Sequence, residues 1–324
     1  MIIRFQIRTI AVIFLMIIFF TLNLSQAYGM EIAVIRSQDL PIYQEAVAGI
    51  KSIYKGKLRE YNLKGDLDES GNIVREIRKH PPDAIITVGL LATVIAKDNF
   101  KSTPIVFCMV LNPDRFSISS GNNITGVPLN VSSSETVPRL REIFPSAKRI
   151  GILYDPGKTG MVELERQVAQ SWGFTLIAKE VPSVKMLPDA LREIQHNIDL
   201  LWLIPDSTVV TPESLEFIFL KAFENNIPVV TFSKELLSRG AVLTFSPDYR
   251  SIGEEASRLV NHILQGKKPA DLPIRPVKKI KTSINLVVAK KMGLEINQAA
   301  IYAMRDQIEI FNPGKTARTN YPDR

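Results

Sequence analysis

The chain has 324 residues, a formal net charge of +7 at pH 7, 45% hydrophobic residues and a single cysteine. One thiol cannot pair within the chain, so a disulfide framework is excluded, and a chain of this length buries enough apolar surface to fold without one. The modest basic excess bounds solubility and gives no support for a nucleic-acid partner.

Residues 1–29 predict export. Arg4 and Arg8 precede an apolar run over 10–24, and small residues follow in Ser25-Gln-Ala-Tyr-Gly29. This pattern is typical of a secretory signal peptide, with cleavage after Ala27 or Gly29. The apolar run is shorter than the roughly 20 residues that span a bilayer, so we expect a cleaved signal and not a retained anchor. The predicted location is periplasmic or otherwise extracytoplasmic.

From residue 31 onward, short β-branched runs alternate with longer amphipathic stretches, which is typical of parallel strands joined by helices. A first series of predicted strands ends before residue 126, and a second series begins near residue 149. A final strand is expected near 282–286. The predicted strands are 32–36, 57–62, 84–88 and 105–109 in the first series, and 149–154, 174–179, 200–204, 229–232 and 242–245 in the second.

The two series repeat one plan. Pro82-Asp-Ala-Ile-Ile86 corresponds to Ile198-Asp-Leu-Leu-Trp202, and in both an Asp opens a buried strand. The next strand of each series starts at a Pro, where the missing N–H costs least. The sequence therefore predicts an α/β protein of two Rossmann-like lobes with parallel sheets. The expected ranges are 30–127 plus about 250–275 for lobe 1, 128–249 plus about 276–296 for lobe 2, and 297–324 for a C-terminal tail.

Two serine-rich segments mark expected helix starts near passages between the lobes. Ser132-Ser-Ser-Glu135 and Ser251-Ile-Gly-Glu254 fit the capping-box pattern. Each follows a short polar segment with a proline, Pro128-Leu-Asn130 or Pro247-Asp-Tyr249, and we predict hinges there. A third passage is expected within 266–276.

Catalytic signatures are not found. His80, His196 and His262 have no metal-binding motif around them, and no glycine-flanked serine is present, so we predict no enzyme activity, no metal and no cofactor. The segment from Gly151 to Lys158-Thr159 resembles a phosphate-binding loop. However, five residues instead of four separate its glycines and Pro156 removes an N–H, so we predict a strand-to-helix turn with Thr159 as a candidate cap.

Ligands of open α/β sheets gather at the carboxyl ends of the strands, where helix starts present free N–H groups. We expect the N–H groups near Gly89, with Thr87, to hold a carboxylate, and Asp155 or Asp206 to accept from an ammonium. Asp206 as a helix cap and Phe232 as a core residue are the alternatives. The candidate ligand-binding residues are Ser37, Gln38, Thr87, Gly89, Met109 and Asn112 in lobe 1, and Tyr154, Asp155, Asp206, Thr208, Phe232 and Ser233 in lobe 2. Of these, Tyr154, Met109 and Phe232 are expected to cover the apolar part of the ligand.

At these residues the chain resembles the ABC transporter substrate-binding protein family, whose better known members resemble tryptophan- or tyrosine-binding proteins. The resemblance runs from about 32 to 296. Its most specific segments are Pro82-Asp-Ala-Ile-Ile86, Thr103-Pro-Ile-Val-Phe107 followed by Asn112-Pro113, Asn122-Asn-Ile-Thr-Gly126, Phe144-Pro-Ser-Ala-Lys-Arg-Ile-Gly151 and Gly266-Lys-Lys-Pro-Ala-Asp271.

The resemblance implies a type I periplasmic binding protein architecture, in which a monomer closes on a small solute and delivers it to an ABC permease and its ATPase. Two departures affect the ligand. Asn112-Pro113 stands where the family usually carries Asp-Pro, and Lys158-Thr-Gly160 replaces a common Asn-Ser pair. The expected ligand is therefore an amino acid or a related zwitterion, without commitment to an aromatic one. A ligand-sensing module that signals to a membrane partner remains the alternative function.

Overall fold

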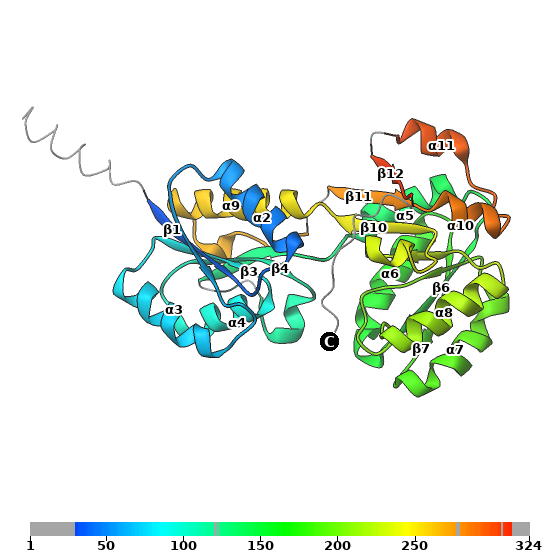
Figure 1. The fold of residues 1–324 in the computed structure, drawn as a ribbon, viewed down its shortest axis with the longest axis horizontal. Coiled ribbons are helices and arrows are strands. Elements are labelled where there is room, and N and C mark those ends of the chain that lie inside the picture. The colour runs from blue at the N-terminus through cyan, green and yellow to red at the C-terminus, as the bar shows by residue number, and fades with distance from the viewer. Residues whose placement is uncertain (1–29, 120, 122, 277–278, 306, 313–324) are drawn as a thin grey trace, which may run out of the picture. The chain divides into compact units, whose positions relative to one another are not determined.

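The computed structural model describes residues 30–119, 121, 123–276, 279–305 and 307–312 (Figure 1). The predicted signal peptide over 1–29 lies outside them. The described residues form two compact α/β units. Unit 1 comprises those within Met1–Leu129 and Tyr249–Arg275, and unit 2 those within Asn130–Asp248 and Pro276–Arg324. The chain thus passes from one unit to the other three times.

Unit 1 is built on a five-stranded parallel sheet with the strand order β2-β1-β3-β4-β5. Four of its strands were predicted to within one residue at either end. The short strand β5 was not predicted, because Gly126 and Pro128 weaken its strand pattern. The elements of unit 1 are β1 (Glu31–Arg36), α2 (Pro41–Ile53), β2 (Lys57–Asn62), α3 (Asp68–Lys79), β3 (Ala84–Val88), α4 (Leu90–Asn99), β4 (Ile105–Val110), η2 (Pro113–Phe116), β5 (Ile124–Pro128), α9 (Tyr249–Leu264) and η7 (Pro269–Asp271).

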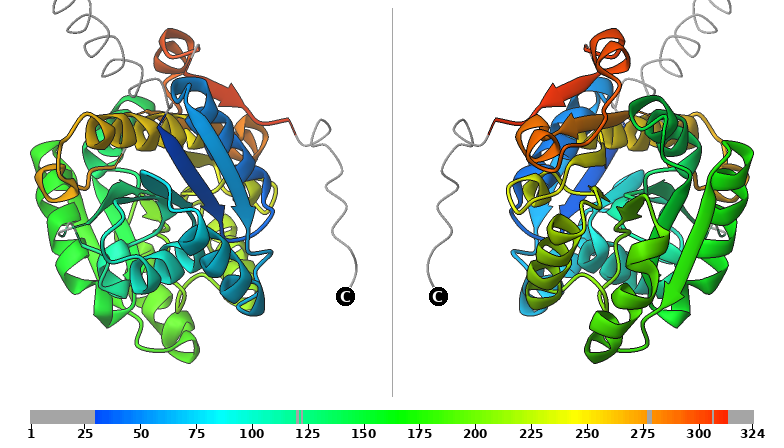
Figure 2. Two further views of the ribbon diagram at one scale, coloured as in Figure 1. Left: turned by 90° about the vertical axis from the view of Figure 1, so that its left-hand side faces the viewer. Right: turned by 90° about the vertical axis from the view of Figure 1, so that its right-hand side faces the viewer.

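Helices cover both faces of this sheet, so its inner strands β1, β3 and β4 are buried on both sides, whereas the edge strand β2 is partly exposed. Ala33 and Ile35 of β1 pack with residues of α3 and α4 such as Ile77 and Ile95. The alternate positions of β1 face α2 and α9, which lie on the opposite face (Figure 1). In the left-hand view of Figure 2, β1 and β2 are seen side by side in blue.

Helices α2 and α9 touch through glycines. A Cβ on Gly253 would lie 1.8 Å from the carbonyl oxygen of Ala46, and a Cβ on Gly49 would lie 2.0 Å from that of Arg250. The two backbones are therefore in direct contact, which only glycine allows at these positions. This close approach fixes α9, which follows a strand of unit 2, onto unit 1.

Unit 2 repeats the same sheet and extends it. Strands β7-β6-β8-β9-β10 are parallel and have the order of the five strands of unit 1, and β11 and β12 follow at the β10 edge. The elements of unit 2 are α5 (Ser133–Ile143), β6 (Arg149–Tyr154), η3 (Pro156–Lys158), α6 (Thr159–Ser171), β7 (Thr175–Glu180), η4 (Val184–Met186), α7 (Leu187–Ile194), η5 (Gln195–Asn197), β8 (Leu200–Trp202), α8 (Pro212–Glu224), β9 (Val229–Thr231), η6 (Lys234–Leu237), β10 (Leu243–Pro247), β11 (Ile280–Ile284), α10 (Leu286–Lys291), α11 (Gln298–Ala303) and β12 (Ile308–Ile310).

The parallel-sheet architecture predicted for both lobes is confirmed, with one exception at the edge of unit 2. Strand β11 pairs antiparallel with β10, because the chain enters β11 from unit 1 and not through a crossover helix that would return it in the parallel sense. Part of the segment expected as a C-terminal tail belongs to the unit, since β12 pairs with β11. The faces of this sheet bury two separate clusters, one with α5, α6, α10 and α11 and the other with α7 and α8.

The duplication extends to individual hydrogen bonds. In unit 1, the Asp83 carboxylate accepts from the Glu31 backbone N–H at 2.7 Å; in unit 2, the Asp199 carboxylate accepts from the Arg149 backbone N–H at 2.8 Å. Each Asp thereby joins the start of the third strand of its unit to the start of the first. Likewise, the Pro104 carbonyl accepts from the N–H of Ile85, the second residue of β3, at 2.8 Å. The Pro228 carbonyl accepts from the N–H of Leu201, the second residue of β8, at 3.0 Å.

The predicted capping boxes are wrong in detail. Ser132 is the N-cap of α5, but its hydroxyl lies 2.8 Å from the Ser134 hydroxyl and does not cap the helix. Helix α9 begins at Tyr249, so Ser251 lies inside its first turn. The capping box that does form was not predicted. Thr211 accepts from the Ser214 N–H at 3.2 Å while the Ser214 hydroxyl accepts from the Thr211 N–H at 2.9 Å, at the start of α8.

The strand-to-helix turn predicted after β6 is confirmed, but Thr159 does not cap it. The Thr159 hydroxyl donates to the Pro156 carbonyl at 2.7 Å. The turn is instead capped by Asp155, whose carboxylate accepts from the Gly157 N–H at 2.8 Å.

We expect Gly253→Ala to lower the free energy of unfolding by about 1–3 kcal/mol, because the new methyl group collides with backbone that cannot move aside. Gly71→Ala in α3 is the matched control. Nothing lies within 4 Å of its Cβ position, so alanine should stabilise the helix by about 0.5–1 kcal/mol. Urea unfolding measures both. Equal effects of the two substitutions would contradict the close contact of α2 with α9.

We expect Asp199→Asn to destabilise unit 2 at neutral pH and much less at acid pH. Burial raises the pKa of Asp199, but the Arg149 guanidinium and the two backbone N–H groups of Lys148 and Arg149 outweigh it and lower the net pKa. The stabilisation by the carboxylate is therefore complete above its unfolded-state pKa and is lost as the pH falls through the folded-state pKa. Because the pair is partly exposed, we expect about 1 kcal/mol at pH 7.

Urea unfolding at pH 7 and at pH 3 measures this difference. Glu163→Gln is the control, since Glu163 forms an exposed pair with Arg166 and should change stability by less than about 0.5 kcal/mol. An Asp199→Asn effect that is the same at both pH values would contradict the assigned role.

Candidate ligand-binding site

In both units the strand order reverses direction between two neighbouring strands, β1 and β3 in unit 1 and β6 and β8 in unit 2. The connections that follow these two strands lead to opposite sides of the sheet. Ligands of open α/β sheets bind outside the carboxyl ends of strands at this switch point. Ser37 and Gly89 follow β1 and β3, and Asp155 and Asp206 lie beyond β6 and β8. The topology thus brings predicted residues together within each unit.

In unit 1 the start of α4 is held tightly against Ser37. The Ser37 hydroxyl accepts from the Ala92 backbone N–H at 3.0 Å. Gly89 has φ of +93°, and a Cβ there would lie 2.6 Å from the Ser37 hydroxyl and 2.6 Å from the Tyr43 hydroxyl. Only glycine fits this position. The start of a ten-residue helix, with its partial positive charge, is therefore fixed beside two hydroxyl groups and suits a carboxylate.

Thr87 lies inside this turn and not on its surface. Its side chain is fully buried, and its hydroxyl is 2.9 Å from the hydroxyl of Thr93, which donates to the Gly89 carbonyl at 2.7 Å. These bonds hold the turn before α4 in shape. The Thr87 hydroxyl is therefore a supporting group. Of the N–H groups near Gly89, that of Gly89 itself donates to the Cys108 carbonyl at 2.9 Å, and that of Ala92 donates to Ser37.

The end of β4 has an unusual backbone. Met109 and Asn112 have φ of +59° and +49°, in the left-handed region that side chains rarely adopt. The register between β4 and β5 shifts between Cys108 and Val110, so the bulge there turns Met109 away from the strand pattern. The Met109 side chain is buried, Asn112 is half-buried, and the predicted Gln38 is exposed next to Gly65.

In unit 2 three predicted residues form one network. Asp206 is buried, and its carboxylate accepts from the backbone N–H groups of Asp155 at 2.9 Å, Thr208 at 2.9 Å and Val209 at 3.1 Å. The Thr208 hydroxyl donates to the Asp155 carboxylate at 2.7 Å. Asp206 thus holds the loop after β8 against the loop after β6. It is not the helix cap weighed from the sequence, because the next helix, α8, is capped by Thr211.

Three further predicted residues of unit 2 have partners within the unit. The Tyr154 hydroxyl donates to Glu180 at 3.3 Å, and burial, followed by the charge of Glu180, raises the Tyr154 pKa. Phe232 is half-buried and packs against the cluster under α7 and α8, and the Ser233 hydroxyl donates to Glu235. Tyr154 and Phe232 therefore contribute to the packing of their own unit.

Two residues at these edges were not predicted. Tyr43, in the first turn of α2, is half-buried against Gly89, and burial, followed by the nearby Cys108, raises its pKa, so its phenol stays protonated as a hydrogen-bond donor. The second is Lys158, which is part of the segment that resembles a phosphate-binding loop. It is only 6% exposed and is the last residue of η3, the turn that Asp155 caps. The proline that starts α2 was the only sequence signal that pointed to the position of Tyr43.

Neither a metal site nor a membrane span occurs in the part of the chain that the structure describes. No group of three or more His, Cys, Asp or Glu side chains is placed to hold a metal ion there. Within the same residues, no helix combines the length and the apolar character that crossing a membrane requires.

Comparison with known proteins agrees with this architecture. The chain is similar to a tyrosine-binding protein of Clostridioides difficile, with 22% identity over 247 residues that cover 74% of this chain and 71% of the relative. It is also similar to an uncharacterized protein of Rickettsia prowazekii, with 24% identity over 219 residues, covering 66% of this chain and 68% of the relative.

Two solved structures share the fold. A substrate-binding protein with adhesive properties from Clostridium difficile, in a ligand-free, open structure, has a TM-score of 0.69 at 19% identity over 87% of this chain and 99% of the other. An ABC domain from Streptococcus pneumonia in complex with L-Trp has a TM-score of 0.60 at 19% identity over 87% of this chain and 100% of the other. The fold is thus that of the type I periplasmic binding proteins.

The family model for ABC transporter substrate binding proteins matches residues 44–307, which is most of the chain. The two α/β units, their repeated strand order and the three passages between them are what the resemblance of the sequence implied. The chain belongs to the ABC transporter substrate-binding protein family.

Proposed function

We propose that the protein captures an amino acid or a related zwitterion outside the cytoplasm and delivers it to an ABC importer. The observation that carries this proposal is the pair of polar sites at the switch points. Unit 1 offers a helix start beside Ser37, which suits an anion. Unit 2 offers the Asp155 carboxylate beside Thr208, which suits a cation. A zwitterion carries both charges.

The carboxylate of the solute binds at the start of α4. The first N–H groups of a helix have no partners within it, and the partial charge of the helix end favours an anion. Because the Ala92 N–H donates to Ser37, the groups proposed for the carboxylate are those of Leu90 and Leu91. Tyr43, protonated and packed on Gly89, adds a hydroxyl donor. Each hydrogen bond to a charged group contributes roughly 1.5–3 kcal/mol, so two or three orient the ligand.

The ammonium group binds at Asp155 and not at Asp206. The Asp206 carboxylate is buried and already accepts three backbone N–H groups. Asp155 is half-buried, so its carboxylate, which accepts from the Gly157 N–H and the Thr208 hydroxyl, is within reach of a solute ammonium. Asp206 serves to position the Asp155 backbone.

We further propose that the two units close on the solute as a hinged pair. The chain passes between them near Pro128 and Pro247 and again at Arg275, and such short connections absorb domain rotations in hinged binding proteins. The solute would stabilise the closed form, and the permease would recognise that form. The ATPase of the permease lies on the far side of the membrane. The predicted signal peptide and the family of the chain support an extracytoplasmic location.

A thermal-shift screen followed by calorimetry tests the proposed ligand class. We expect one or more amino acids, with tryptophan and tyrosine included in the panel, to stabilise the purified protein by about 2.7 kcal/mol at a hundred times the dissociation constant. Sugars, purines and simple carboxylic acids should stabilise it far less. A sugar or a purine as the best ligand would contradict the proposal.

Asp155→Asn tests the ammonium site. We expect it to weaken binding of the amino acid at least about tenfold, equal to about 1.4 kcal/mol, because the charge that pairs with the ammonium is lost. Binding of the deaminated analogue, which has the same carboxylate and side chain, should change little. Asp189→Asn, in an exposed pair with Arg192, is the control. An equal loss for both ligands would remove Asp155 from the ammonium site.

A further inference from the structure

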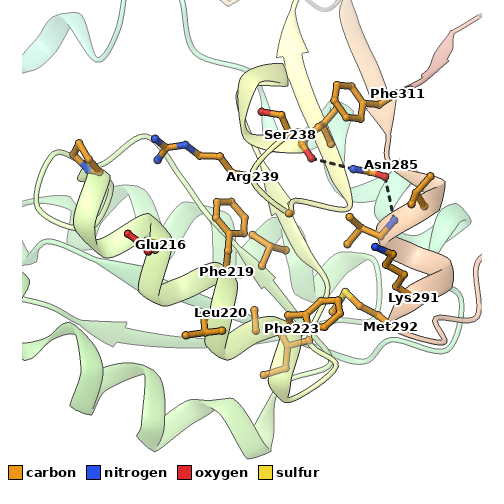
Figure 3. Close-up of a pocket in the computed structure, with 18 of the residues that line it drawn as sticks. Glu216, Phe219, Leu220, Phe223, Ser238, Arg239, Asn285, Lys291, Met292 and Phe311 are labelled. Atoms are coloured by element: carbon orange, nitrogen blue, oxygen red, sulfur yellow. Dashed lines mark hydrogen bonds between the residues drawn. The ribbon is translucent and has the colours of Figure 1, made fainter. Parts of the chain in front are cut away.

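Unit 2 carries a groove of about 1030 Å³ far along the sheet from the candidate site (Figure 3). Val229, the first residue of β9, lines it, as do Gly240, which precedes β10, and Asn285, which follows the antiparallel β11. The groove is therefore at the amino ends of the parallel strands. Asp155 and Asp206 lie beyond the carboxyl ends, so the proposed solute site does not account for this groove.

The floor of the groove is apolar and firmly held. Phe219, Met292 and Phe311 form part of it and are at most 8% exposed. Asn285 joins two walls, since its amide donates to the Leu237 carbonyl at 3.0 Å and accepts from the Val288 N–H at 3.1 Å (Figure 3). The floor of the groove is thus built from buried side chains, and its two walls are joined by Asn285.

Large apolar side chains also stand at the rim. Leu220 and Phe223 of α8 are 54% and 47% exposed, and Val287 of α10 is 46% exposed. Large apolar side chains exposed beside an apolar groove mark an interaction site. A small molecule in the floor would leave these rim residues in water, whereas a longer occupant lying along the groove would cover them.

The two walls carry opposite charges. Glu213 and Glu216 lie on α8, and Arg239 and Lys291 lie on the facing segment after η6 and on α10. Among the described residues, none of these four side chains forms an ion pair. The occupant that matches this surface has an apolar ridge with basic residues along one flank and acidic residues along the other.

Two other occupants fit less well. A second copy of this groove is itself concave, so two grooves facing one another would leave a void. The residues that follow Phe311, 313–324, contain Tyr321 as their only large apolar side chain and have no ridge to fill the floor.

We propose that the groove binds an amphipathic helix of a partner protein, with apolar residues at i, i+3, i+4 and i+7, a basic flank against α8 and an acidic flank against Arg239 and Lys291. Helix-in-groove recognition has these features: an apolar face buried in a hydrophobic groove, with charged flanks that select the partner.

Three synthetic helical peptides with the same leucine ridge test this proposal, by fluorescence anisotropy on the purified full-length protein. One has a lysine and a glutamate flank, one has two lysine flanks and one has two glutamate flanks. We expect the mixed peptide to bind about tenfold more tightly than either uniform one. Phe223→Glu, at an exposed rim position, should abolish binding without changing the melting temperature.

Glu213→Lys combined with Glu216→Lys makes both walls basic, so the preference should move to the peptide with two glutamate flanks. Glu163→Lys, exposed on α6, is the control and should leave the preference unchanged. Three results would overturn the proposal: binding that ignores the flanks, displacement of the peptide by dodecanoate at the same groove, or a self-association that Phe223→Glu abolishes.

Discussion

In a parallel sheet the carboxyl ends of all strands lie at the same end of the sheet. This constraint determines where each unit can hold a ligand. The strands can place ligand-binding residues side by side at their carboxyl ends only if they start in register. Asp83 and Asp199 secure this, because each joins the start of the third strand to the start of the first. The carbonyls of Pro104 and Pro228 set the start of the next strand in the same way. The repeated geometry at the carboxyl ends therefore depends on these two Asp and two Pro residues at the amino ends of the strands.

Most of the strands could be predicted because their signal is local. Buried parallel strands are short apolar runs between turn residues, and the Asp and Pro that open them recur in both halves of the sequence. Strand β5 was missed because Gly126 and Pro128 weaken its local pattern, and β12 because its pairing depends on an edge strand, β11, that only the folded sheet provides. The antiparallel sense of β11 also depends on the route of the chain through the other unit.

The sequence predicted which residues lie at the carboxyl ends of the strands better than it predicted what they contact. The carboxyl-end rule selected Ser37, Gly89, Asp155 and Asp206, and the structure brings each pair together within its unit. Which hydroxyl or carboxylate is left at the surface depends on partners distant in sequence. The hydrogen bond of Asp206 to the loop of Asp155 spans 51 residues, and no local pattern reveals it.

The loops at the carboxyl ends and at the amino ends of the unit 2 strands differ in polarity, and the difference follows from the groups buried there. At the carboxyl ends of the strands, the buried Asp206 carboxylate needs hydrogen bonds and accepts them from the backbone N–H groups of the loops after β6 and β8, which it holds closely together. At the amino edge the strands begin among apolar residues, and Phe219, Phe223 and Met292 surround an open groove. Strands β9 and β10 run from one end of the sheet to the other, so the proposed solute site and the proposed helix-binding groove lie at opposite ends of unit 2 and would not compete for the same surface.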